Sequence, residues 1–121
     1  MKYILLIYDD EQVRVKSSEA ERKQMYGEYA QLTQQIQSGG QYVAGSGLQP
    51  TATATSVRVR DGQRLLTDGP FAETREQLGG YYLVDARDLD EAISIAARIP
   101  SARQGTVEVR PLMVMPAPAN S

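Results

Sequence analysis

The chain has 121 residues, a formal net charge of −2, and neither cysteine nor histidine. A domain of this length can bury a core, and its acidic balance argues against nucleic-acid binding, which usually requires an excess of basic side chains. The missing residue types exclude disulfides, a thiol nucleophile and a histidine proton shuttle. We expect one domain over residues 1–115 and a flexible tail over residues 116–121.

The first predicted strand, residues 2–8, is apolar on both faces: Tyr3, Leu5 and Ile7 alternate with Ile4, Leu6 and Tyr8. Such a strand needs cover on both faces of its sheet. One helix layer covers only one face, so the pattern predicts a homodimer. The amino-terminal apolar run is too short for a signal peptide or a membrane span, which predicts a cytoplasmic protein that does not enter the membrane.

Two amphipathic helices are predicted. The first follows a capping box formed by Ser18 and Glu21 and ends at Gly39, and its inner stripe consists of Met25, Tyr29, Leu32 and Ile36. The second follows a capping box of Asp88 and Glu91 and ends before Pro100, and its inner stripe consists of Leu89, Ala92, Ile93, Ala96 and Ile99.

The remaining strands are predicted at residues 42–44, 53–60, 63–67, 77–85 and 106–114, with a tight hairpin turn at Asp61-Gly62. The resulting order is β-α-β-(hairpin)-β-α-β. This order is typical of an α+β, ferredoxin-like βαββαβ domain with an extra hairpin and both helices on one sheet face.

One motif stands out between the hairpin and the next strand: Asp68-Gly69-Pro70-Phe71-Ala72-Glu73-Thr74, followed by Gln77-Leu78-Gly79-Gly80-Tyr81-Tyr82. The chain resembles the DGPF-motif branch of the YCII-related family here and over residues 3–8, 43–62, 88–92 and 107–111. The resemblance implies a subunit that pairs sheet to sheet into a dimeric α+β barrel, and an association with extracytoplasmic-function sigma factors. A His-Asp pair proposed as the active site of the wider family cannot form in this chain.

Arg60, Asp68, Glu73 and Tyr82 are the predicted ligand contacts of a polar cleft near this motif, with Arg60 meeting Asp68 or an anionic ligand across the hairpin. The first hypothesis is a small-molecule-binding or accessory protein with no cofactor and no metal. The alternative is a cofactor-free lyase or isomerase, with Asp68 and Glu73 as catalytic acid and base. A second alternative is a purely structural interaction module, in which the Asp68 turn is architectural and no ligand-sized cavity exists.

Two smaller patterns also carry expectations. The acidic run Asp9-Asp10-Glu11 is interpreted as a solvated strand end rather than a Mg²⁺ site. Gly79-Gly80 predicts a bulge or a close approach of two backbones, and only one of Tyr81 and Tyr82 can face the helices.

Overall fold

The computed structural model describes residues 1–115; the predicted tail at 116–121 lies outside the described residues. The elements are, in chain order, β1 (Lys2–Asp9), α1 (Glu11–Lys16), α2 (Glu19–Ser38), β2 (Tyr42–Gly47), η1 (Thr51–Thr53), β3 (Thr55–Arg60), β4 (Gln63–Asp68), β5 (Gln77–Asp85), α3 (Leu89–Ala97), η2 (Pro100–Arg103) and β6 (Thr106–Pro111). None of the helices in residues 1–115 is long and apolar enough to cross a membrane.

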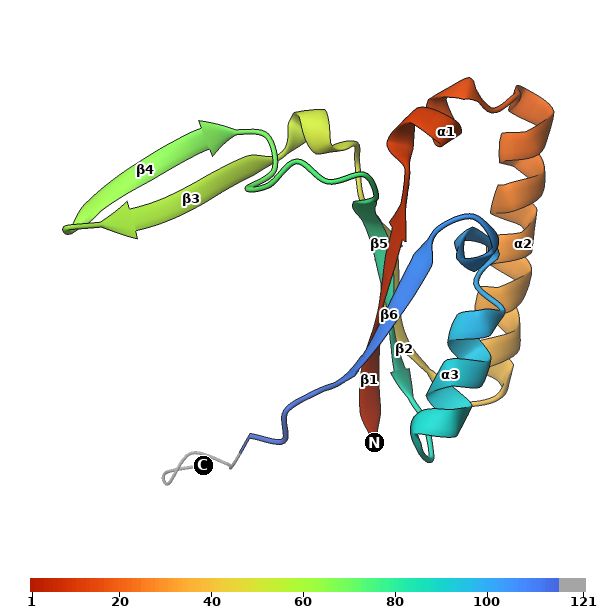
Figure 1. The fold of residues 1–121 in the computed structure, drawn as a ribbon. Helices are drawn as coiled ribbons and strands as arrows, with labels where there is room; N and C mark the ends of the chain where they lie inside the picture. The colour runs from red at the N-terminus through yellow and green to blue at the C-terminus, as the bar shows by residue number, and fades with distance from the viewer. Residues whose placement is uncertain (116–121) are drawn as a thin grey trace.

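The main sheet has four antiparallel strands in the order β2-β5-β1-β6, and α2 and α3 cover one of its faces (Figure 1). This is the α+β, ferredoxin-like arrangement that the element order predicts. β3 and β4 do not join this sheet. They form a separate two-stranded hairpin, which points away from the sheet on the side opposite the helices (Figure 1).

Local sequence signals explain where the helices begin and end. At α2, the Ser18 side chain accepts from the Glu21 amide, and the Glu21 carboxylate accepts from the Ser18 amide. Gly39 caps the other end, and Gly40 follows with a φ of 77°. At α3, the Asp88 carboxylate accepts from the Glu91 amide, but the Glu91 carboxylate accepts from the Arg87 amide instead of completing the predicted box.

The core lies between the helices and one sheet face. Its largest fully buried side chains are Leu5, Ile36, Val84, Ile95, Ile99 and Pro100. The predicted stripe of α2 is largely confirmed, because Leu32 and Ile36 are buried and Tyr29 packs against the core. The predicted stripe of α3 is partly wrong. Leu89 and Ile93 are exposed, and Ile95 occupies the core instead.

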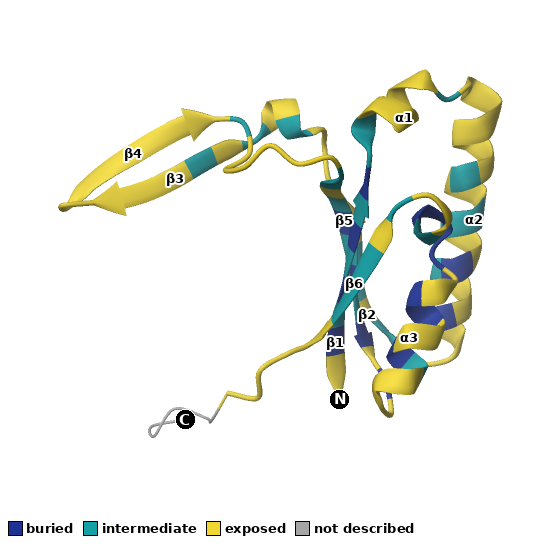
Figure 2. Cartoon of the chain, viewed as in Figure 1, coloured by how far each residue is buried: buried dark blue, intermediate teal, exposed yellow. Residues whose placement is uncertain are grey.

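The opposite sheet face has no helix of residues 1–115 over it (Figure 2), and its centre is apolar. Leu6 pairs with Tyr81 and Ile4 pairs with Leu83, so these four side chains form two neighbouring cross-strand pairs. All four are half-buried, unlike the fully buried Leu5 and Val84 on the helix side. Glu108 and Arg110 form an ion pair on β6 beside them. The prediction that β1 is apolar on both faces and covered on only one within the chain is therefore confirmed.

Two further predictions about glycines and tyrosines are confirmed. Tyr82 is buried on the helix side, so Tyr81 lies on the opposite face. The pairing of β1 with β5 shifts between Ile7 and Tyr8, which is the bulge expected near Gly79. A Cβ on Gly80 would lie 2.9 Å from the carbonyl oxygen of Ser46, so the two backbones approach closely there as well.

Candidate functional site

A buried ion pair lies at the carboxyl end of β1. Asp9 is only 6% exposed, and both of its carboxylate oxygens accept from Arg14 Nη2, at 2.9 and 3.0 Å. The Arg14 side chain on α1 is 43% exposed, so solvent can reach the cation of the pair although the carboxylate is buried. A Cβ on Gly79 would lie 2.9 Å from Arg14 Nη2, so this glycine leaves the room that the guanidinium occupies. The arrangement presents a cation that is held in place by a buried carboxylate.

The interpretation of Asp9 as part of a solvated strand end was wrong. Strand alternation places Asp9 on the same face as Leu5 and Ile7, and this signal was available in the sequence. Its two neighbours also have specific partners. Asp10 caps α1 by accepting from the Gln12 amide, and the Glu11 carboxylate accepts from the amide and hydroxyl of Thr51.

Two tyrosines lie in the helix–sheet interface, and one of them, Tyr29, is close enough to Asp9 to feel its charge. The Tyr29 hydroxyl shares a 2.7 Å hydrogen bond with buried Ser101, and the Tyr82 hydroxyl shares a 2.7 Å hydrogen bond with Thr33. The two rings stack with centroids 6.4 Å apart. Burial is the main cause that raises the pKa of both phenols above the ordinary 10.0, and the nearby Asp9 charge adds to the effect at Tyr29.

Alkaline pH is expected to destabilise the fold through these tyrosines. Above pH ~10 the unfolded chain loses phenol protons that the folded chain keeps, so the free energy of unfolding falls as pH rises further. Urea unfolding between roughly pH 8 and pH 11 should show a shallower decline in Tyr29→Phe than in the natural chain. Tyr26→Phe is the control because Tyr26 is exposed. Identical slopes in all three proteins would contradict this role of Tyr29.

The DGPF segment connects the hairpin to the main sheet close to the ion pair. At its beginning, Gly69 donates to the Ala54 carbonyl and accepts from the Ser56 hydroxyl, which closes the base of the hairpin. At its end, the Gln77 side-chain oxygen accepts from the Glu11 amide at 2.9 Å. The segment is therefore tied at its far end to the first turn of α1, the helix that carries Arg14.

The predicted contacts Arg60, Asp68, Glu73 and Tyr82 are not brought together within one chain. Tyr82 lies in the core between helices and sheet. Asp68 and Glu73 are exposed at the base of the hairpin and in the connector. Arg60 is paired with Gln63 beside the turn, whereas Asp68 is paired with Thr55 at the other end. The hypothesis that Arg60 meets Asp68 across the hairpin is wrong, because five residues of strand, about 17 Å, separate them.

Two surface hollows lie near the helices, and neither is lined by these four residues. The larger, of about 540 Å³, is an open depression beside α3, lined mainly by charged residues that include Arg87, Asp88, Glu91 and Arg98. The smaller, of about 180 Å³, lies between α2 and Arg98. Both are separate from the DGPF segment, so within one chain they do not supply the predicted cleft.

Comparison with known proteins identifies the family. The profile of the YCII-related domain matches residues 1–116. The uncharacterized protein R00369 of Rhizobium meliloti (strain 1021) is 37% identical over 114 residues, which cover 93% of this chain and 92% of that protein. The sequence resemblance to the wider family is therefore confirmed, and this chain belongs to the YCII-related family.

Proposed function

We propose that this YCII-related chain is a homodimeric small-molecule-binding or accessory protein of the DGPF type, in which a second copy completes a polar cleft beside the Asp68–Glu73 turn. The observation that carries the proposal is the apolar sheet face formed by Ile4, Leu6, Tyr81 and Leu83, which no helix within the described part of the chain covers. Apolar strand faces are normally buried, and a second copy of the same face is a self-complementary cover.

The chemistry beside the DGPF connector favours an anionic small molecule. Both hydrogen bonds of the Arg14 guanidinium to residues 1–115 come from Nη2, so Nε and Nη1 keep donors for another group. Asp9 fixes the guanidinium in one position, which lowers the entropic cost of binding. An anionic oxygen, such as that of a carboxylate, is the group that best accepts a charge-assisted hydrogen bond from either of these donors.

The alternative, a cofactor-free lyase or isomerase, requires Asp68 or Glu73 to be desolvated so that one carboxylate can act as an acid or base. Both are exposed in residues 1–115. The geometry of the single chain therefore favours binding over catalysis. An accessory role with a sigma factor rests on the resemblance to the DGPF branch alone.

Sedimentation equilibrium is expected to give a dimer for the natural chain and a monomer for Leu6→Arg, because an arginine in the centre of the apolar face cannot be desolvated cheaply. Ile93→Arg is the matched control: Ile93 is an exposed apolar side chain on α3, on the helix side. A monomeric natural chain at micromolar concentration, or two variants with equal effects, would refute the dimer.

A thermal-shift screen of carboxylate-containing metabolites, each paired with its neutral amide, tests the ligand class. A ligand at 100 times its dissociation constant should add ~2.7 kcal/mol, or about 10 °C in melting temperature for a domain of this size. The shift should be lost with the amide and reduced in Arg14→Lys, Arg60→Ala or Asp68→Asn. No shift across the panel for a folded dimer would reject ligand binding and favour the interaction module.

A further inference from the structure

The β3–β4 hairpin, residues 55–68, is an amphipathic arm that the rest of residues 1–115 leaves open to solvent. Every residue of β4, and every residue of β3 except Ser56, is exposed. The register places Val57 opposite Leu66 and Val59 opposite Arg64. Val57, Val59 and Leu66 therefore share one face, which we call the apolar face of the arm; Thr55, Arg64 and Asp68 are its polar members. The other face carries Arg58, Arg60, Gln63, Ser56 and Thr67, with Leu65 as its one apolar residue.

This one-sided pattern is the pattern of a strand pair that is buried on one face. The apolar face is nevertheless open to solvent in the single chain: Val57, Val59 and Leu66 are 59%, 62% and 61% exposed. An isolated two-stranded hairpin is marginally stable in water, and packing against another element is what usually stabilises it. The arm therefore needs a surface to pack on.

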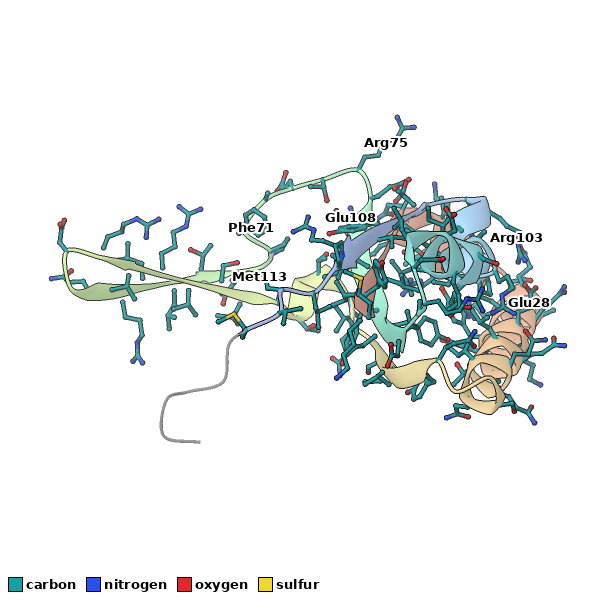
Figure 3. All side chains as sticks on the ribbon, turned by 90° about the horizontal axis from the view of Figure 1, so that it is seen from below. Glu28, Phe71, Arg75, Arg103, Glu108 and Met113 are labelled. Atoms are coloured by element: carbon teal, nitrogen blue, oxygen red, sulfur yellow. The ribbon has the colours of Figure 1, made fainter. Side chains whose placement is uncertain are left out.

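The arm and the uncovered sheet face lie on the same side of the molecule (Figure 1). Phe71, at the base of the arm, is 82% exposed, and the chain after β6 continues on that side with exposed Met113 (Figure 3). Apolar groups on the arm, on its base and on the carboxyl-terminal segment thus surround the space in front of the uncovered face. A second copy placed on the uncovered face would therefore be close to the arm, to the base of the arm and to the segment after β6.

The dimensions of the arm agree with this placement. Its six-residue strands span about 20 Å, two packed sheets lie about 10 Å apart, and a four-stranded sheet is about 15 Å wide. The arm leaves the sheet of its own copy in the direction of the second copy. Its length therefore allows it to reach past the edge of the second copy's sheet. Two-fold symmetry would repeat the contact, so that each copy would hold the other with one arm.

We infer that the β3–β4 hairpin is a dimerisation arm whose apolar face packs on the flank of a second copy of this chain. The inference rests on the proposed homodimer and adds the contact that supports it. It also gives the turn at Asp61-Gly62 a role: the two residues have φ values of 51° and 73°, which keep the arm a tight hairpin with a defined register. The DGPF segment forms the base of the arm, next to the same interface.

Single cysteines test the inference without interference, because the natural chain has no cysteine. Leu66→Cys and Leu65→Cys are a matched pair, adjacent in sequence and on opposite faces of the arm. In the single chain Leu66 is the more exposed of the two, so a free arm would let a thiol reagent reach position 66 at least as fast as position 65. The dimerisation arm predicts the reverse: alkylation at position 66 should be roughly tenfold slower in the purified dimer.

The same pair in the Leu6→Arg background separates the outcomes. If that background is monomeric and position 66 becomes as reactive as position 65, the arm packs on the second copy. A dimer in which position 66 is never protected would overturn the arm and leave the homodimer standing. Protection that persists in the monomer would mean that the arm folds onto its own chain, which also overturns the inference. A natural chain that is monomeric would overturn both proposals.

Discussion

Gly105→Ala is expected to be strongly destabilising, by about 3 kcal/mol, which corresponds to a fall of roughly 12 °C in melting temperature. A Cβ at this position would lie less than 3.0 Å from the Tyr8 carbonyl oxygen and 3.0 Å from Asp9 Cα. These are backbone atoms of the central strand β1, so they cannot rotate away as a side chain would. Gly105 also donates to the Ser101 carbonyl at 2.7 Å, which ties it to η2.

Gly27→Ala is the matched control for this prediction. Gly27 lies within α2, and a Cβ there would meet nothing within 4 Å. The same substitution should therefore stabilise the chain by up to ~1 kcal/mol, through the higher helix propensity of alanine. Urea unfolding of both variants measures the difference. Equal effects of the two substitutions would show that the close approach of β6 to β1 does not control stability.

Arg14→Ala is expected to destabilise the fold by about 2 kcal/mol, because it leaves the buried Asp9 carboxylate without its cation. The loss should be smaller than the 3–5 kcal/mol typical of a fully buried pair, since Arg14 is half-exposed and water can reach the vacated position. The readout is the free energy of unfolding from urea denaturation.

A double-mutant cycle isolates the pair itself. Asp9→Asn alone should also destabilise, but the double variant Asp9→Asn/Arg14→Ala should lose less than the sum of the two single variants. The coupling is expected to be about 1–2 kcal/mol. Strictly additive losses would mean that the two residues contribute independently and that Asp9 does not hold the guanidinium in place. Arg22→Ala is a suitable control, since Arg22 is an exposed arginine on α2 whose guanidinium donates to the Ser17 carbonyl and not to a carboxylate of residues 1–115.

Much of the local structure could be predicted because its causes lie within a few residues. The Ser18–Glu21 box, the hairpin turn at Asp61-Gly62 and the bulge beside Gly79 all depend on neighbouring backbone groups. Two wrong predictions, the contact between Arg60 and Asp68 and the solvent exposure of Asp9, could have been avoided by using local signals of this kind. The hairpin turn already sets the pairing of Arg60 with Gln63, which separates Arg60 from Asp68. Strand alternation already places Asp9 on the helix side.

Other features could not be predicted from local patterns. Leu89 and Ile93 fit the periodicity of an inner stripe as well as Ile95 does, and only the packing of α3 on the sheet selects Ile95 for the core. The short helix α1 was not predicted, yet it supplies Arg14, and this residue has no sequence signal that links it to Asp9. The roles of Arg60, Asp68 and Glu73 as ligand contacts, the sigma-factor association and the cytoplasmic location stay predictions.

The family, the order of the elements and the apolar character of both faces of β1 could all be predicted from the sequence, because they follow from motifs, caps and side-chain alternation over short distances. Three features depend on tertiary packing: the β3–β4 hairpin leaves the main sheet, Asp9 and Arg14 meet, and one apolar sheet face has no helix of residues 1–115 over it. The physical reason is that pairing between distant segments depends on the summed packing of many side chains. A short sequence pattern reports on neighbouring residues only, so it cannot predict which distant segments will pair.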